Sequence, residues 1–183
     1  VAPYTSVQGY SASPALYKSA VIVPADGKPT TPNYLTALHR KTGKVVWRSP
    51  RPRDNENYAS PLVARVGGRD QLFIIGTCKS NKVGKTISYD PNNGRKLWET
   101  AGPATYAAAT VAFSGNMVYA TGGYPQKSLV AITVAGRGRV VWRSDKRAGY
   151  VPSPVISGGL LYAVSDKSGL MRCYDAATGT VIW

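Results

Sequence analysis

The stretch Cys173-Tyr-Asp-Ala-Ala-Thr-Gly-Thr-Val-Ile-Trp183 decides the fold, because three similar stretches precede it in the chain. They are Ala37-Leu-His-Arg-Lys-Thr-Gly-Lys-Val-Val-Trp47, Ser88-Tyr-Asp-Pro-Asn-Asn-Gly-Arg-Lys-Leu-Trp98 and, one residue longer, Ala131-Ile-Thr-Val-Ala-Gly-Arg-Gly-Arg-Val-Val-Trp142. Successive tryptophans are 51, 44 and 41 residues apart, and a glycine lies four residues before each of them: Gly43, Gly94, Gly138 and Gly179. Repeats of about 40–50 residues are typical of propeller blades.

A second landmark recurs in phase with the tryptophans. It consists of Ser13-Pro14, Ser60-Pro61 and Ser153-Pro154, with Ala109-Thr110 at the corresponding place in the third unit. A tyrosine lies two or three residues before each of these pairs: Tyr10, Tyr58, Tyr106 and Tyr150. Two landmarks in phase predict four structural repeats, with approximate blades at residues 10–50, 58–101, 106–144 and 150–183.

Each unit divides into four short segments separated by turn residues. In the second unit the segments are 59–66, 71–77, 86–90 and 96–100, and Gly67-Gly68 and Pro91-Asn92-Asn93-Gly94 are two of the turns between them. Apolar runs of this length, bounded by glycine, proline and asparagine, are typical of strands joined by tight turns. The chain is therefore predicted to be all-β, a propeller segment of four antiparallel four-stranded blades.

The residues of the motif have physical roles. The glycine supplies the positive φ that the turn between the third and fourth strands requires. Asp90 and Asp175 are expected to accept hydrogen bonds from backbone amides of that turn, and His39 stands at the same place in the first copy. A small residue opens each regular copy, which leaves room for close packing, and the tryptophan is expected to dock between neighbouring blades. All of these motif residues are thus predicted to be structural.

The pattern small-x-Asp-x-x-Thr-Gly-x-x-x-Trp resembles the tryptophan-docking motif of the PQQ-like repeat propellers, a family that contains quinoprotein alcohol dehydrogenases and BamB-like lipoproteins. The resemblance covers nearly the whole chain. It implies an eight-bladed ring, at the upper end of the ~4–8 blades of known propellers, and a periplasmic or extracellular location. It implies fold rather than activity, because function resides in sites added to a fold. The third copy departs from the pattern, with an inserted residue and Thr133 near the aspartate position, so its turn is expected to be irregular.

Four blades leave two alternatives open. The chain is a fragment or half of a larger propeller, or two chains pair as a homodimer to complete a ring. A closed four-bladed ring is disfavoured by the blade geometry that the family resemblance implies.

Residues for catalysis are not found in the sequence. The resemblance implies that a catalytic member would carry a vicinal cysteine pair and a calcium-binding set, whereas Cys78 and Cys173 are far apart and the only glutamates are Glu56 and Glu99. A single histidine argues against a hydrolytic triad. We therefore expect no catalytic residue, no metal site and no cofactor in this chain. The alternative is a fragment of a PQQ-dependent dehydrogenase whose cofactor residues lie outside it.

Charge indicates the kind of partner. The net charge is +14, from 23 basic and 9 acidic residues, which favours an acidic protein or polysaccharide. A polyanion-binding module is a further alternative. Nucleic acid is disfavoured, because the chain has no RNP-like motif, zinc-knuckle spacing or block of consecutive basic residues. No segment approaches the ~20 apolar residues of a membrane helix, and residues 1–4 do not resemble a signal peptide.

The predicted binding surface is the face of the propeller that carries the longer loops. The tyrosines at 10, 58, 106 and 150 are expected near the channel mouth on this face, where they either pack between blades or bind a ligand. Basic residues are expected beside them: Arg51, Arg53, Lys146 and Arg147. The sequence thus predicts a non-catalytic binding or scaffold module at the cell envelope, with a net-positive loop face.

Overall fold

The computed structural model describes residues 9–27, 30–52, 57–78, 83–103, 106–124, 126–145, 148–166 and 168–183. Within these ranges the chain forms fifteen β-strands and no helix. The strands assemble into four separate antiparallel sheets, and within each sheet the strands follow chain order. The prediction of an all-β chain with four blades is confirmed.

Each of the first three sheets has four strands, and we number the sheets as blades 1 to 4. The strands are β1 (Ala15–Tyr17), β2 (Ala20–Ala25), β3 (Asn33–His39) and β4 (Val45–Arg51) in blade 1; β5 (Leu62–Val66), β6 (Arg69–Cys78), β7 (Val83–Tyr89) and β8 (Lys96–Ala101) in blade 2; and β9 (Ala112–Ser114), β10 (Met117–Gly122), β11 (Ser128–Thr133) and β12 (Arg139–Ser144) in blade 3.

Blade 4 has three regular strands, β13 (Val155–Ser157), β14 (Leu160–Val164) and β15 (Met171–Asp175). The fourth, outer strand that the repeat predicts for this blade is reduced to one bridge, between Tyr174 and Val181. Backbone hydrogen bonds still hold this segment beside β15, from Cys173 N to Trp183 O (3.0 Å) and from Ile182 N to Cys173 O (2.9 Å). The segment therefore occupies the place of an outer strand without forming a regular ladder.

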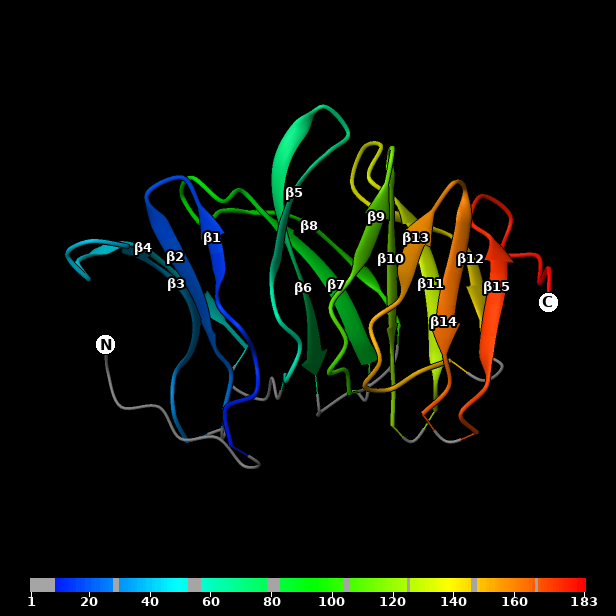
Figure 1. Cartoon of the computed structure of the whole chain (residues 1–183). Coiled ribbons are helices and arrows are strands. Elements are labelled where there is room, and N and C mark those ends of the chain that lie inside the picture. The colour runs from blue at the N-terminus through cyan, green and yellow to red at the C-terminus, as the bar shows by residue number, and fades with distance from the viewer. Residues whose placement is uncertain are drawn as a thin grey trace.

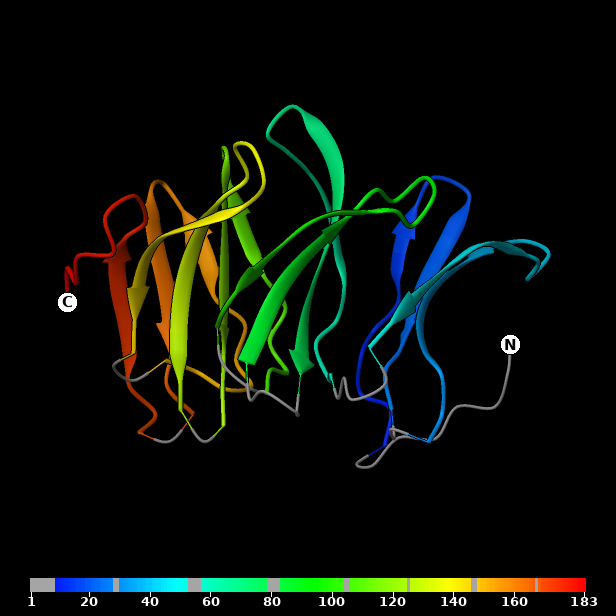
Figure 2. The ribbon, with the colours of Figure 1, turned by 180° about the vertical axis from the view of Figure 1, so that it is seen from behind.

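The blades stand side by side in chain order, so the colours run from blue to red across the molecule, as both views show (Figure 1 and Figure 2). Three clusters of buried side chains fill the three junctions between blades. Strand β6 shows how one strand serves two junctions: Leu72 and Ile74 belong to the cluster shared with blade 1, whereas Phe73 and Ile75 belong to the cluster shared with blade 3. Both faces of the strand are covered, which explains its continuous apolar sequence.

The turn between the third and fourth strands has the same backbone in three blades. In blade 2 the amide of Gly94 donates to Asp90 O (2.8 Å), the amide of Asp90 donates to Arg95 O (2.8 Å), and Gly94 has φ +73°. His39 begins the equivalent turn in blade 1 and Asp175 in blade 4, with the same pair of backbone bonds. Only glycine adopts this φ without strain, which accounts for the glycine of the motif.

The small residue of the motif lies between two large side chains. Ser88 pairs with Phe73 on one side and Trp98 on the other, and the two ring centroids are 6.0 Å apart. A larger side chain at this position would push the rings apart. The same arrangement recurs with Tyr119, Ala131 and Trp142 in blade 3, and with Tyr162, Cys173 and Trp183 in blade 4.

Each of the first three tryptophans docks on the glycine of the following blade. A Cβ atom placed on Gly94 would lie 2.4 Å from the ring of Trp47. The corresponding distances are 2.4 Å from Gly138 to Trp98 and 2.6 Å from Gly179 to Trp142. The motif glycine therefore has a second role, because it leaves the space that the indole of the preceding blade fills.

The indole N–H groups are satisfied in two ways. Trp47 donates to Pro91 O (3.1 Å) and Trp142 donates to Ala176 O (3.0 Å), both in the turn of the following blade. Trp98 faces the irregular turn of blade 3 and donates instead to Gln71 Oε1 (3.1 Å) in its own blade. Gln71 is fully buried and also accepts from Ser88 Oγ (2.7 Å), so this junction is held by a polar network of blade 2.

The two end blades carry the unmatched halves of this contact. Gly43 has φ +68°, like the docked glycines, but no atom lies within 4 Å of a Cβ placed on it. Trp183 is 60% exposed. Within the described residues the blades therefore form an arc whose ends are not joined to each other.

Candidate functional site

The segments that lead into the first strands link neighbouring blades. Tyr58 N donates to Ala107 O (3.4 Å), and Ala108 N donates to Tyr150 O (3.4 Å). These segments therefore form a hydrogen-bonded lining along the first strands, at the lower edge of the arc in Figure 1. Three of the four predicted binding tyrosines, at 58, 106 and 150, are half-buried in this lining, and Tyr10 is 47% exposed.

The serine of the second landmark has a structural role in this lining. Ser60 Oγ accepts a hydrogen bond from Ser13 N (2.8 Å) of the preceding blade. Ser153 Oγ accepts in the same way from Thr110 N (3.0 Å). The recurrence of serine thus follows from blade-to-blade bonding.

Tyr124 is an aromatic residue that the sequence interpretation missed. It is 65% exposed, and its ring centroid lies 6.5 Å from that of Tyr106. The pair presents aromatic surface beside the loop between β10 and β11. The run Gly122-Gly123-Tyr124 was the signal that could have indicated it, because adjacent glycines are typical of a loop.

Arg51 is not part of an exposed basic surface. Its side chain is buried, with Nε 2.7 Å from Asp26 Oδ1 and Nη1 3.3 Å from the hydroxyl of Tyr89 in blade 2. Burial by itself would lower the pKa of Arg51, but the charges and hydrogen bonds of Asp26 and Tyr89 outweigh it and raise the pKa. The residue therefore stays charged as part of the junction. Arg53, Lys146 and Arg147 lie outside the described residues.

Further described basic residues of the strands and longer loops have acidic partners. Lys85 Nζ lies 2.6 Å from Glu99 Oε1, and Lys127 Nζ lies 2.5 Å from Asp166 Oδ1. A longer pair joins Arg143 and Asp145 at 3.6 Å. These pairs offset part of the positive charge that was expected on the loop face.

The opposite face, at the top of Figure 1, carries the short turns, and it too is rich in basic residues. Ten exposed basic residues lie in these turns or at the strand ends beside them: Lys18, Arg40, Lys41, Lys44, Arg65, Arg69, Arg95, Lys96, Arg137 and Arg139. The acidic residues in the same places are Asp70, Asp90 and Asp175. Two of the basic residues are paired, Lys96 with Glu99 (2.7 Å) and Arg65 with Asp70 (3.6 Å). We call this surface the turn face.

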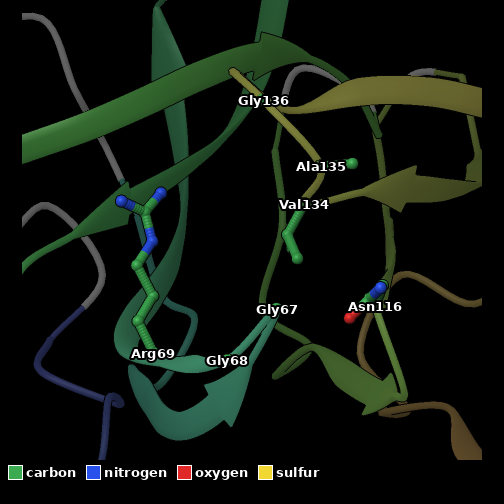
Figure 3. Close-up of a pocket in the computed structure, with 7 residues that line it drawn as sticks. All are labelled: Gly67, Gly68, Arg69, Asn116, Val134, Ala135 and Gly136. Carbon is green, nitrogen blue, oxygen red and sulfur yellow. The ribbon is translucent and has the colours of Figure 1, made fainter.

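Two hollows open on the turn face, one on each side of the turn between β5 and β6. The smaller, of about 350 Å³, lies between blades 1 and 2, and its lining includes Asp70, Asp90 and Arg95. The larger, of about 610 Å³, lies between blades 2 and 3. In Figure 3 the turn bearing Gly67 and Gly68 faces the segment 134–136 across the larger hollow, with Arg69 to one side and Asn116 to the other.

The motif aspartates act within their own turns. Asp90 accepts from the backbone amide of Asn92 (2.9 Å) and from the side-chain amides of Asn92 and Asn93 (2.9 and 3.2 Å). Partial burial would raise the pKa of Asp90, but these hydrogen bonds lower it overall. Asp175 accepts from the backbone and hydroxyl of Thr178, which lowers its pKa in the same way. Both carboxylates are therefore ionised near neutral pH, as turn acceptors.

The described residues do not assemble a metal centre. Nowhere in the described ranges do three or more His, Cys, Asp or Glu side chains come together to hold an ion. The same ranges contain no helix long and apolar enough to span a membrane.

Four sheets joined by tryptophan–glycine docking define the chain as a β-propeller segment of the tryptophan-docking class. Over residues 5–183 it matches the model of the family described as outer membrane protein assembly factor BamB, and it belongs to that family. No match is found among curated proteins.

Solved structures with a similar fold include proteins of two kinds. BamB from Moraxella catarrhalis aligns over 98% of this chain and 50% of its own, with 18% identity and a TM-score of 0.60. Quinohemoprotein alcohol dehydrogenase ADHIIG from Pseudomonas putida HK5 aligns over 93% of this chain and 33% of its own, with 16% identity and a TM-score of 0.66. The Comamonas testosteroni quinohemoprotein alcohol dehydrogenase aligns over 98% and 35%, with 14% identity and a TM-score of 0.71. At these identities the likeness shows the fold, and the chain spans half or less of each of these proteins.

Proposed function

We propose that this chain is a non-catalytic binding or scaffold segment of a propeller at the cell envelope, in the periplasm or outside the cell, and that its partner is an acidic protein. The description of its family as an outer membrane protein assembly factor supports a protein-binding role at the envelope. The observation that carries the partner chemistry is the turn face, where ten exposed basic side chains accompany three acidic ones and the Glu99 carboxylate that pairs with Lys96. A surface with this excess attracts acidic partners and steers their approach.

The test is binding of the 183-residue chain to acidic and neutral peptides over a range of salt concentrations. We expect the acidic peptide to bind and the neutral one not to bind, with affinity falling as salt screens the charges. Equal affinity for both peptides would contradict the proposal. Retention on heparin without any binding of acidic peptide would replace it with the polyanion-binding alternative.

A PQQ-dependent dehydrogenase is the second candidate, because two of the similar structures are quinohemoprotein alcohol dehydrogenases. The described residues do not fit a calcium centre, since no acidic cluster is present among them. This alternative places the cofactor residues outside the chain, so the candidates are separated by adding PQQ and calcium to the complete ring and then measuring dye-linked alcohol oxidation. We expect no oxidation, and alcohol-dependent dye reduction above the protein-free rate would overturn the non-catalytic proposal.

Pairing of two copies into one ring is the form that we propose for the 183-residue chain in solution. The exposed Trp183 at one end and the uncovered Gly43 at the other are the two halves of the contact that joins the internal blades. Light scattering after size-exclusion chromatography gives the mass directly. A dimer that dissociates in Trp183→Ala supports this form, and a monomer at all concentrations refutes it.

A further inference from the structure

The two hollows on the turn face occupy equivalent places in successive blades. Each is bounded by the inner turn of one blade and by both turns of the next, and both share Gly68 and Arg69. Their linings nevertheless differ in charge. The hollow between blades 1 and 2 contains the carboxylates of Asp70 and Asp90, whereas the lining of the hollow between blades 2 and 3 contains no carboxylate.

The departure of the third motif copy accounts for one of the two missing carboxylates, that of Asp90. Thr133 pairs with Arg139 at the place where Asp90 bonds to Arg95 in blade 2, so Thr133 is the structural equivalent of the missing aspartate. One extra residue lengthens the turn that follows, and this turn contributes the small residues Ala135 and Gly136 to the lining. The substitution removes a negative charge, and the hollow is the larger of the two, about 610 against about 350 Å³.

The remaining groups in the larger hollow suit an anion. Arg69 is exposed, and no carboxylate of the described residues lies within ion-pair distance of it. Asn116 is exposed on the other side, and its side-chain amide offers an N–H donor. Gly67, Gly68 and Gly136 have positive φ and no side chains, so the backbone is uncovered around the hollow. A guanidinium together with amide donors is a set that binds carboxylates.

We infer that the hollow between blades 2 and 3 binds a carboxylate side chain from an acidic, extended polypeptide segment of a partner protein. The inference rests on the proposed function and assigns it a site. A polypeptide fits better than a polysaccharide, because the lining has no aromatic ring on which a sugar could stack. Asp70 and Asp90 repel a carboxylate from the neighbouring hollow, which favours binding on the blade 3 side of Arg69.

The test uses the 183-residue chain and a fluorescein-labelled peptide of alternating glutamate and glycine, measured by fluorescence anisotropy. The glutamine–glycine peptide is the neutral control. Salt of about 0.1 M limits long-range attraction to roughly 10 Å, so that local contacts dominate the differences between variants. Arg69→Glu is compared with Arg40→Glu, since both residues are exposed arginines of the turn face and both changes alter net charge equally. Asn116→Asp adds one negative charge to the hollow with almost no change in shape.

We expect Arg69→Glu to weaken binding of the glutamate peptide about tenfold and Asn116→Asp about three- to fivefold, because charged hydrogen bonds contribute more than neutral ones. Arg40→Glu should change the affinity by less than about twofold. Equal losses in Arg69→Glu and Arg40→Glu would overturn the inference but leave the acidic-partner proposal intact. Failure of the unmodified chain to bind the glutamate peptide would overturn both. Heparin binding that Arg69→Glu abolishes, without peptide binding, would show that the occupant is a polysaccharide and overturn the inference.

Discussion

Replacement of Gly94 by alanine measures what the docking of one tryptophan contributes to stability. The new Cβ atom would lie 2.4 Å from the ring of Trp47, at a φ of +73°. We expect the positive φ to cost about 1 kcal/mol and the displacement of a buried indole to cost about 2 kcal/mol more, as overpacking does. The free energy of unfolding should therefore fall by about 3 kcal/mol, from a marginal total.

Gly43→Ala is the matched control. Gly43 has the same place in its motif and a φ of +68°, but nothing lies within 4 Å of the added atom. It should cost only the backbone contribution of about 1 kcal/mol. Urea titrations followed by tryptophan fluorescence give both values, provided that the m-value stays constant.

A double-mutant cycle isolates the contact itself. In a Trp47→Leu background the cost of Gly94→Ala should fall towards that of Gly43→Ala, which leaves a coupling energy of about 2 kcal/mol. Equal costs for the two alanine variants in the unmodified chain would refute the idea that the glycine is required by its neighbour's ring.

Three further changes test other contacts. Arg51→Ala leaves Asp26 buried without its cation and should lower the free energy of unfolding by about 3–5 kcal/mol, whereas a loss below 1 kcal/mol in urea titrations would show that the pair is not buried in solution. Asp90→Asn should destabilise the chain at neutral pH but not in acid. The Asp90 carboxylate has a lowered pKa in the folded chain, so it stabilises the fold above its unfolded pKa, and this contribution is lost as the pH falls through the folded pKa. Equal losses of thermal stability at pH 7 and pH 3 would contradict this. Ser88→Leu forces a larger side chain between the rings of Phe73 and Trp98 and should lower the free energy of unfolding, measured by urea titration, by about 1–3 kcal/mol. Unchanged stability would show that the two rings are not packed against Ser88.

The sequence was sufficient to predict the blades because the motif is local. The glycine turn, the small residue and the tryptophan lie within eleven residues in the regular copies, so their spacing is fixed whatever surrounds them. Ser60 and Ser153 were found in the same way, because each belongs to a Ser-Pro pair that recurs in the sequence. Their bonding to the preceding blade was not predicted, because it depends on how the blades stack.

The charge distribution could not be predicted from the sequence for a related reason. Arg51 occurs in a stretch with other basic residues and was expected at the surface. It is buried because Asp26 and Tyr89, which are distant in sequence, surround it in the fold. The hollow beside Arg69 likewise arises from turns of two blades. The irregular third motif copy was noticed in the sequence, but the loss of a carboxylate from a hollow becomes apparent only when blades 2 and 3 are placed together.

The tryptophan contacts also give the row of blades a polarity. At each described junction the indole comes from the earlier blade and the glycine from the later one. Such a contact is heterologous, so units joined through it add in one direction only, and they form a closed ring or an open filament according to the rotation at each step. Changes that alter this rotation without weakening the contact would therefore favour fibres over rings, and a polar filament visible by electron microscopy would be their signature.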